Sequence, residues 1–311
     1  MTLTRIEKTK VPTMKNKKRI YISGCGGMLG EAFYKVFQND YILKCTDIDL
    51  NENWLSYCDI RNYEQYFTDV NEFKPDYLFH LGAHTDLEFC EANQEDAHKT
   101  NTTSVEYACK IASALDIPLL YISTAGIFDG TKEVYDDWEN PNPLGVYART
   151  KYLAEVIVQK HMKDYLICRA GWMMGGGPNK DKKFINKIIR QIRNGKKEIF
   201  VVNDKLGTPT YTMDFAKNVK LLIEKNEFGL YNMVCEGLTS RKDVLTELLR
   251  IMEYENKIKV TEVTSDYFSK EYFALRPYSE RLINSKLNSK GLNIMQDWKI
   301  ALQDYIKNYF L

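Results

Sequence analysis

The chain has 311 residues, 44% of them hydrophobic and 27% charged, which is typical of a globular protein and excludes a disordered or fibrous one. The 43 Lys and Arg residues almost balance the 42 Asp and Glu residues, so nucleic acid is not an expected partner. Apolar runs such as 117–122 fall far short of the roughly 20 residues that span a bilayer, so no membrane segment is expected.

The seven cysteines form no C-x-x-C pair, and several of them lie inside apolar runs. This pattern predicts free thiols in a reducing compartment, the cytoplasm, rather than a disulfide framework. None of the four histidines has the spacing of metal ligands, so no metal site is predicted.

Strands and helices alternate along the first half of the chain. Strands are expected at 19–23, 41–46, 77–81, 118–123 and 165–169, and helices at 29–38, 62–73, 95–115 and 145–161. Such alternation predicts an α/β fold in which a Rossmann-like, doubly wound parallel sheet carries helices on both faces.

The alternation of strands and helices becomes less regular after Gly171. Helices are expected at 183–193, 214–225 and 244–252, strands at 198–202 and 257–263, and a last helix holds Trp298, Leu302 and Tyr305. Ser240 and Asp243 resemble a capping box before the third of these helices. We expect a polar N-terminal extension over 1–18, a first domain over 19–170, and a smaller C-terminal α/β lobe over 171–311 that is partly interleaved with it.

Three glycines stand between the first expected strand and helix, at Gly24, Gly27 and Gly30. In a dinucleotide-binding turn the first glycine permits the tight bend, the second admits the pyrophosphate, and the third lets helix and strand pack closely. Met28 and Leu29 then begin the helix whose N-terminus faces the phosphates. The placement therefore predicts an NAD(H) or NADP(H) site.

Asp47 ends the second expected strand, 17 residues after Gly30. A carboxylate there accepts hydrogen bonds from ribose hydroxyls and repels a 2′-phosphate, which favours NAD(H) over NADP(H) without excluding the latter. The alternative is that Asp47 is a solvated turn residue. Asp59 and Ile60 follow a third short strand, where such folds hold the adenine.

Tyr147 and Lys151 share one face of the expected helix 145–161. A free phenol has a pKa of about 10, and a neighbouring ammonium lowers it, so the pair can act in proton transfer. Thr124 ends the strand before this helix and therefore lies where open α/β sheets bind ligands. A surface helical pair is the alternative for Tyr147 and Lys151.

The chain from Arg19 to the end resembles the extended short-chain dehydrogenase/reductases and, within them, the dTDP-4-dehydrorhamnose reductase family. The motifs that carry the resemblance are 24–30 (GCGGMLG), 81–86 (LGAHTD), 123–130 (STAGIFDG), 147–151 (YARTK), 169–172 (RAGW), 202–210 (VNDKLGTPT), 229–232 (GLYN) and 297–298 (DW).

The resemblance implies hydride transfer from a reduced nicotinamide to the 4-keto carbon of a nucleotide-linked deoxysugar, in deoxysugar or polysaccharide biosynthesis. Tyr147 would protonate the developing alkoxide, Thr124 would hold that oxygen, and Lys151 would bind the cofactor ribose. The cofactor would also contact Leu81, Gly82, Ala83 and Asn101, the last of which matches an asparagine of the proton relay. A homodimer is the expected assembly.

Four residues are candidates for substrate binding. His84 and Thr85 follow a strand end, Trp172 follows another, and the Arg276 guanidinium suits a diphosphate. The alternatives are loop packing for His84 and Thr85, core packing for Trp172, and a surface ion pair for Arg276.

Some positions depart from the family pattern. At the two positions where this chain has Ala125 and Gly126, related dehydratases carry a pair of acids and the reductases carry Asp-Tyr. Because neither Ala125 nor Gly126 can donate a proton, dehydration is disfavoured. Lys205 replaces the usual Gln, and the family's RPxNSxL becomes RPYSERL over 276–282. These changes bear on the sugar and its nucleotide carrier more than on hydride transfer.

Two other functions remain open. One is a nucleotide-sugar epimerase that retains NAD and returns the hydride. The other is a non-catalytic regulatory subunit that keeps the nucleotide-binding fold.

Overall fold

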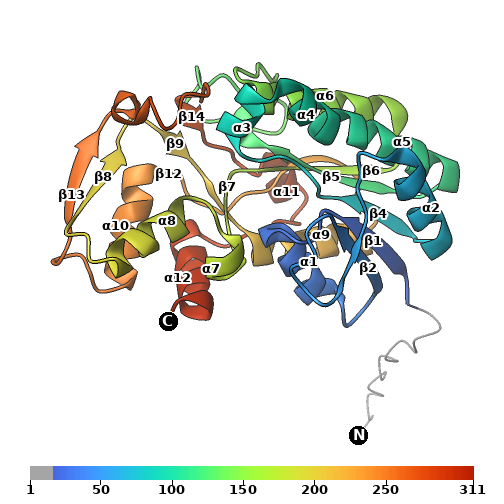
Figure 1. Cartoon of the computed structure of the whole chain (residues 1–311), viewed down its shortest axis with the longest axis horizontal. Coiled ribbons are helices and arrows are strands. Elements are labelled where there is room, and N and C mark those ends of the chain that lie inside the picture. The colour runs from blue at the N-terminus through green and yellow to red at the C-terminus, as the bar shows by residue number, and fades with distance from the viewer. Residues whose placement is uncertain (1–16) are drawn as a thin grey trace, which may run out of the picture.

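A sheet of seven parallel strands forms the centre of the molecule (Figure 1). The computed structural model describes residues 17–311, so the predicted extension over 1–18 lies almost wholly outside it. The strand order is β11-β6-β5-β4-β1-β2-β3. The strands are β1 (Arg19–Ser23), β2 (Ile42–Asp47), β3 (Leu55–Tyr57), β4 (Tyr77–His80), β5 (Leu119–Thr124), β6 (Tyr165–Ala170) and β11 (Gly229–Asn232).

This order confirms the predicted Rossmann-like fold and fixes where a ligand binds. From β1 the chain continues outward through β2 and β3, whereas β4, β5 and β6 follow on the other side of β1. Strand order therefore reverses between β1 and β4, and the crevice for ligands lies at the carboxyl ends of these strands.

Helices cover both faces of the sheet. On one face lie α1 (Met28–Phe37) and α9 (Thr212–Glu224), and on the other α2 (Tyr63–Phe73), α5 (Ser104–Leu115) and α6 (Val146–His161). Side chains of β1 alternate between the two layers, since Ile20 and Ile22 pack with Phe33 and Phe215 while Tyr21 packs on the opposite side. Both faces of the strand are thus buried, as parallel sheets require.

The predicted helix 95–115 is interrupted. It consists of α4 (Gln94–His98), the π-helical turn η2 (Lys99–Thr103) and α5, and the short helix α3 (Leu87–Ala92) precedes it. Asn101 lies in the π-helical turn, and its side chain forms hydrogen bonds with the backbone of His84, which tie this turn to the loop after β4. Such turns often occur at functional sites.

The second half forms a lobe beside the carboxyl edge of the sheet. Its strand pairs are β8 (Glu198–Val202) with β13 (Lys259–Val263), β7 (Trp172–Met174) with β10 (Pro209–Tyr211), and β9 (Leu206–Gly207) with both β12 (Thr239–Ser240) and β14 (Ser279–Glu280). The helices are α7 (Gly177–Lys180), α8 (Phe184–Arg193), α10 (Arg241–Ile251), α11 (Ser285–Ser289) and α12 (Trp298–Tyr309), with short 3-10 turns at η3 (Ala125–Ile127) and η4 (Ser265–Phe268).

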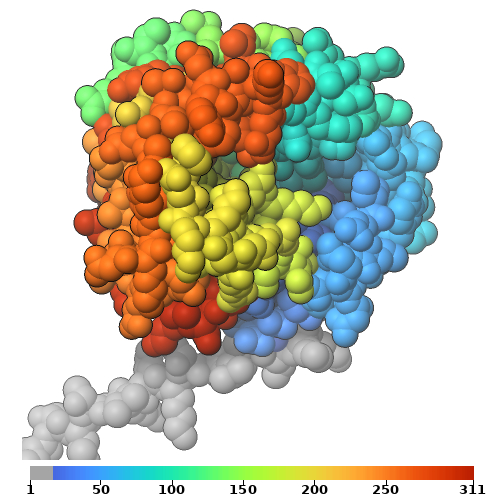
Figure 2. Space-filling model, turned by 60° about the vertical axis from the view of Figure 1, so that its left-hand side comes forward, coloured from blue at the N-terminus to red at the C-terminus, as the bar shows by residue number. Residues whose placement is uncertain are grey.

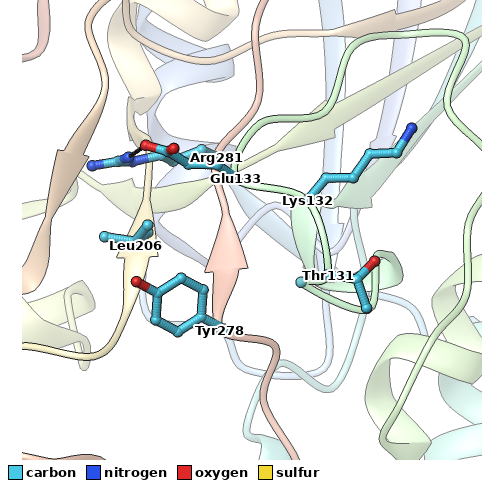
Figure 3. A pocket seen from close by; sticks show the side chains of 7 residues that line it. Thr131, Lys132, Glu133, Leu206, Tyr278 and Arg281 are labelled. Carbon is cyan, nitrogen blue, oxygen red and sulfur yellow. Dashed lines mark hydrogen bonds and ion pairs between the residues drawn. The ribbon is translucent and has the colours of Figure 1, made fainter.

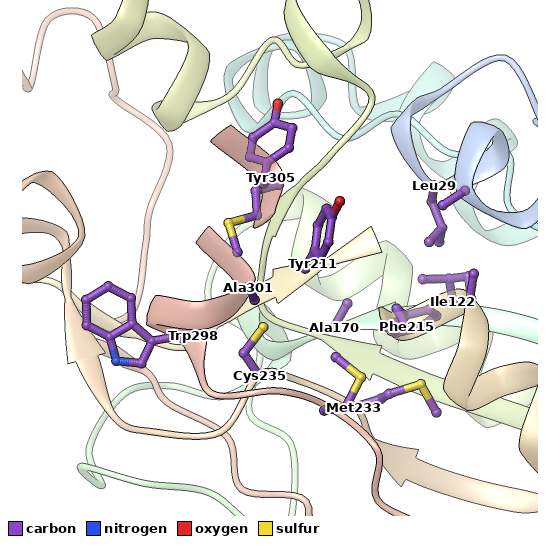
Figure 4. Packing of buried hydrophobic residues seen from close by; sticks show 14 of the residues in the cluster. Leu29, Ile122, Ala170, Tyr211, Phe215, Met233, Cys235, Trp298, Ala301 and Tyr305 are labelled. Atoms are coloured by element: carbon purple, nitrogen blue, oxygen red, sulfur yellow. The ribbon is translucent and has the colours of Figure 1, made fainter. Parts of the chain in front are cut away.

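The two halves share elements and a core. Strand β11, from the second half, pairs with β6 and completes the sheet. Figure 4 shows Ile122 and Phe215 of one buried cluster, with Trp298, Ala301 and Tyr305 of α12 on its other side. In Figure 2 the yellow and orange segments of the lobe lie against the teal and blue segments of the first half, with a hollow where they meet.

The capping box before α10 is present, because Ser240 accepts a hydrogen bond from the Asp243 amide and Asp243 accepts one from the Ser240 amide. The helix consequently begins at Arg241, three residues before the predicted start. All seven cysteines are buried free thiols. Over residues 17–311, no helix has the length and apolarity to cross a membrane, and no three acidic, His or Cys side chains group as metal ligands would.

Candidate active site

The glycine turn after β1 brings two predicted cofactor-binding segments into backbone contact. Gly24 has φ +69°, and a Cβ on it would lie 2.2 Å from the amide nitrogen of Gly82. A Cβ on Gly30 would lie 2.1 Å from the carbonyl oxygen of Cys25, inside the turn itself. Only glycine fits at either position, for the reasons of bending and close packing that the sequence indicates.

Gly27 is different, because the space around it is open. It is the N-cap of α1 with an ordinary φ of −80°. Among residues 17–311, no side chain caps the helix, and a Cβ on Gly27 would meet no atom within 4 Å. Met28 and Leu29 open the ten-residue helix. Its first amides are therefore available to an anion, which fits the pyrophosphate of a dinucleotide.

Asp47 lies beside this turn and holds it. Its Oδ2 accepts a hydrogen bond from the Gly26 amide at 2.8 Å, and its Oδ1 accepts one from the Asp49 amide at 3.0 Å. Lys180, from the second half of the chain, donates to the Gly26 carbonyl oxygen at 3.0 Å and pairs with Glu52 at 3.1 Å. Sequence reasoning missed Lys180, since no motif marks it.

The other predicted cofactor residues border the same crevice. The Asp59 carboxylate forms an ion pair with Arg61 at 2.9 Å, which lowers its pKa. Ile60 packs on Gly82, because its Cδ1 is 2.5 Å from where a Cβ on that glycine would stand. Leu81 follows β4 and donates its amide to Ser23 at 2.9 Å, and Gly82 and Ala83 continue the segment.

Thr124 and Tyr147 meet at the carboxyl edge of the sheet. Thr124 is the last residue of β5, and its Oγ1 accepts a hydrogen bond from the Gly126 amide at 3.1 Å. Tyr147 lies on the first turn of α6. Burial raises the pKa of Tyr147, and hydrogen bonding with Thr124 opposes that rise. Lys151 is not among the groups that shift the pKa of Tyr147, so the predicted lowering by this ammonium is not found.

Lys151 lies one turn after Tyr147 and is buried, with 4% of its surface exposed. Its ammonium stands 4.3 Å from the centre of the Tyr121 ring, and the Tyr121 hydroxyl donates to the Lys151 carbonyl oxygen at 3.1 Å. Burial lowers the pKa of Lys151 to about 7, although Glu155 partly compensates. A buried amine of this kind is a frequent mark of a functional site.

Asn101, His84 and Thr85 form a braced loop beside these residues. The Asn101 side chain accepts from the His84 amide at 2.8 Å and donates to its carbonyl oxygen at 3.0 Å. The His84 ring contacts Asp96 at 3.0 Å, and Lys183 donates to the Thr85 carbonyl oxygen at 2.8 Å. All three predicted residues thus contact one another or the lobe, which fixes the loop after β4.

Trp172 begins β7 with its indole N–H donating to Glu280 Oε2 at 2.7 Å. The Arg241 guanidinium lies 3.6 Å above the indole ring, and no carboxylate of the described residues lies within ion-pair distance of it. Burial lowers the pKa of Arg241 to about 10. The predicted pocket residue Trp172 is therefore flanked by one acidic and one basic side chain.

Arg276 is held by an ion pair within the chain. Its two terminal nitrogens contact the Glu88 carboxylate at 2.8 and 2.9 Å, and it also donates to the Ala274 carbonyl oxygen at 2.9 Å. This matches the ion-pair alternative for Arg276, although both partners remain partly exposed.

A separate hollow of about 470 Å³ lies beside the segment 278–281 (Figure 3). Its lining includes Leu206, Tyr278 and the ion pair between Arg281 and Glu133. None of the predicted site residues lines it, so it is distinct from the crevice described above.

The family model described as the RmlD substrate binding domain matches residues 18–311. The chain belongs to this family. It is 29% identical over 280 residues to a dTDP-4-dehydrorhamnose reductase of Escherichia coli, covering 85% of this chain and 90% of that one. It is 26% identical over 292 residues to a spore coat polysaccharide biosynthesis protein of Bacillus subtilis, covering 93% and 97%.

Solved structures of the family agree. The crystal structure of a dTDP-4-dehydrorhamnose reductase of Clostridium acetobutylicum is 30% identical, with a TM-score of 0.85, and covers 93% of this chain and 99% of its own. That of Bacillus anthracis, in complex with NADP, is 27% identical with a TM-score of 0.84, and covers 94% and 99%. The resemblance inferred from the motifs is thereby confirmed.

Within this RmlD family member, sequence reasoning overlooked Glu280 and Arg241. The sequence did contain a signal for Glu280, because this residue lies in the segment RPYSERL, which departs from the family pattern. Arg241 carried none, since an arginine at the start of a helix usually lies in solvent.

Proposed function

We propose that the protein reduces the 4-keto group of a nucleotide-linked deoxysugar with a reduced nicotinamide cofactor, in the synthesis of a deoxysugar or surface polysaccharide. The observation that carries this proposal is the meeting of Thr124 and Tyr147 at the carboxyl end of β5, beside the crevice at Gly24 and Gly82, in an RmlD family member. Residues 19–170 would hold the cofactor and most of 171–311 the sugar.

The residues present suit protonation of an oxygen. When bound, the reduced nicotinamide supplies the hydride. Thr124 Oγ1 accepts from the Gly126 amide, and its O–H, which hydrogen-bonds with Tyr147 in this structure, would donate to the substrate oxygen when the sugar binds. Tyr147 keeps its proton at neutral pH because burial raises its pKa, so it acts as the general acid. A positioned acid contributes about 10²- to 10⁴-fold to the rate.

Lys151, one helical turn after Tyr147, would support this chemistry. Its ammonium, whose pKa burial lowers to about 7, would contact the cofactor ribose. Asn101 would act as a positioning residue, because its amide is already committed to the backbone of His84.

The residues around the glycine turn also support a choice between the two nicotinamide cofactors. A carboxylate beside the glycine turn disfavours a 2′-phosphate, so Asp47 supports a preference for NADH over NADPH. The open space at Gly27 and the uncapped start of α1 would receive the pyrophosphate. Asp59 and Ile60 would border the adenine.

The diphosphate of the sugar carrier would meet a cluster of positive charges. Arg276 is close enough to Arg241 to lower its pKa, and Arg241 has the same effect on Lys183. Arg276 is already paired with Glu88, so Arg241, which has no ion-pair partner among residues 17–311, would contribute most to the attraction of an anion. His84, Thr85 and Trp172 would line the path between this cluster and Thr124.

The test is turnover of a panel of 4-keto nucleotide sugars with NADH and with NADPH, measured by loss of nicotinamide absorbance. We expect oxidation of the cofactor with at least one sugar, and no oxidation in a Tyr147→Phe variant. Oxidation with none of the sugars would overturn the proposal. Turnover without added cofactor would favour the epimerase, and cofactor binding with unchanged biological function in Tyr147→Phe would favour a regulatory subunit.

A further inference from the structure

Glu280 is a carboxylate built into the active site from a distant part of the chain. It belongs to β14, whose pairing with β9 fixes its backbone, and the preceding residue, Ser279, is fully buried. The Glu280 side chain is only partly buried, so it borders open space. Its position is therefore determined by the lobe, while its charge faces the crevice.

The absence of a side chain at residue 126 makes room for this carboxylate. A Cβ on Gly126 would lie 3.3 Å from Glu280 Oε1 and 3.5 Å from Thr124 Oγ1. A side chain at this position would be in tight contact with the carboxylate and would require it to shift. Hence the acidic group and the hydroxyl that holds the substrate oxygen border the same small space.

The two oxygens of Glu280 have different partners. Oε2 accepts the 2.7 Å hydrogen bond from the Trp172 indole, which fixes the orientation of the carboxylate. Oε1 receives no hydrogen bond from any side chain or backbone group of residues 17–311. Arg241 lies over Trp172 but beyond ion-pair distance of Glu280, so it does not neutralise Oε1 by contact. One oriented acceptor thus points toward the space beside Thr124.

Glu280 is also close to the proton donor. Its charge is one of the causes that raise the pKa of Tyr147. The carboxylate and the phenol are thus both near the Thr124 hydroxyl, at which the carbonyl of the proposed substrate would sit.

We infer that Glu280 Oε1 accepts a hydrogen bond from a hydroxyl or ammonium group on the sugar carbon next to the reduced carbonyl, and so selects substrates that carry a donor there. In a 4-keto-6-deoxyhexose, C5 carries the methyl group, so the donor is the substituent at C3. This inference rests on the proposed function, because it needs a carbonyl at Thr124 and Tyr147.

The chemistry favours discrimination. A charged acceptor contributes more through a hydrogen bond than a neutral one, and a substrate that lacks the donor leaves the carboxylate unpaired when water is expelled. The expected preference for a C3 donor over C3-deoxy is roughly 10- to 150-fold in kcat/KM, the range for a hydrogen bond to a charged group.

The experiment compares wild type with Glu280→Gln and Glu280→Ala on three 4-keto-6-deoxy nucleotide sugars that carry hydroxyl, amino or hydrogen at C3. Glu280→Ala should lose most of the preference for a donor. Glu280→Gln retains an acceptor for the indole and should keep part of the preference for the hydroxyl, but lose more of it for the ammonium. Thermal unfolding and circular dichroism confirm that each variant is folded.

Glu133→Gln is the matched control, since it removes an exposed carboxylate that pairs with Arg281 near the same segment. It should behave as wild type does on all three sugars. An equal preference in wild type and Glu280→Ala would overturn the inference while leaving the reductase intact. Absence of turnover by wild type with every sugar would instead overturn the proposed function.

Discussion

The Lys151 ammonium stands 4.3 Å from the centre of the Tyr121 ring, whose hydroxyl donates to the carbonyl oxygen of the same lysine. A strand of the sheet and the helix that carries Tyr147 are thus joined through one residue. Because an aromatic face attracts a cation, this contact offsets part of the cost of burying the lysine.

This lysine makes stability depend on pH. Burial lowers its pKa to about 7 in the folded protein, compared with about 10.4 in an unfolded chain. Between these values the unfolded state binds more protons, so this group makes the folded state more stable as the pH rises. Below pH 7 the lysine is charged in both states, so the full free-energy cost of burying its charge lowers the stability of the folded state.

We expect Lys151→Met to be more stable than wild type near pH 7, with an advantage that shrinks by up to about 1.4 kcal/mol for each pH unit toward pH 9. Urea unfolding of both proteins across this range measures it. Buried tyrosines and cysteines titrate in both proteins and cancel in the difference. Parallel stability curves would contradict the lowered pKa of Lys151.

Loss of the Tyr147 hydroxyl should abolish catalysis without unfolding the protein. We expect Tyr147→Phe to lower kcat by about 10²- to 10⁴-fold, because the general acid is missing. Tyr152→Phe removes a hydroxyl from the same helix and should leave kcat unchanged. Cofactor binding, followed by fluorescence, should be equal in both variants, and substantial turnover by Tyr147→Phe would exclude its role as acid.

Two glycines of one turn should respond in opposite ways to the same substitution. Gly24→Ala should destabilise the fold by about 1–3 kcal/mol from its positive φ alone, and more from the contact with Gly82. Gly27→Ala should destabilise the fold much less, by the modest cost of alanine at an N-cap, but weaken cofactor binding, because its methyl group enters open space at the start of α1. Thermal unfolding and cofactor titration separate the two effects, and a Gly27→Ala variant as unstable as Gly24→Ala would contradict this account.

Asp47 should decide between the two cofactors. Asp47→Asn keeps an acceptor for the Gly26 amide but removes the charge, so the ratio of kcat/KM for NADPH to that for NADH should rise at least about 5-fold, since one charge near another costs about 1 kcal/mol even in water. Asp49→Asn is the control for a nearby loss of charge. If the ratio changed equally in both variants, the cofactor preference would come from the total negative charge of this region rather than from Asp47.

The ion pair between Glu155 and Arg169 is buried behind the site, with side-chain exposures of 0% and 4%. Two hydrogen bonds, of 3.0 and 2.8 Å, join them. Removing one partner leaves the other charge buried, so Glu155→Leu or Arg169→Met should each cost about 3–5 kcal/mol of unfolding free energy. The double variant should cost less than the sum of the two, and additive losses in urea unfolding would contradict a direct pairing.

Much of the sheet was predictable from the sequence, because alternating strands and helices, with apolar residues on both strand faces, leave few other arrangements. Gly24 and Thr124 could be singled out from the sequence because local turns and strand ends determine their positions. In contrast, Glu280 touches the space at Gly126 through contacts between remote segments, which no local pattern encodes. The same holds for the pairing of Arg276 with Glu88.

The energetic balance at Tyr147 was also beyond the sequence. Helical spacing places Lys151 one turn from Tyr147, but only the packing around the phenol shows that burial raises its pKa. Likewise, the hydrophobic pattern of 95–115 predicts a continuous helix, whereas the structure interrupts it with a π-helical turn at Lys99–Thr103.

Strand β11 enters the sheet from the far half of the chain, beside β6. A gene truncated near residue 170 would therefore encode a product whose last strand has a bare edge, ready to pair with other molecules and aggregate. The molecule should melt in a single transition, and attempts to obtain its nucleotide-binding portion alone should yield insoluble material.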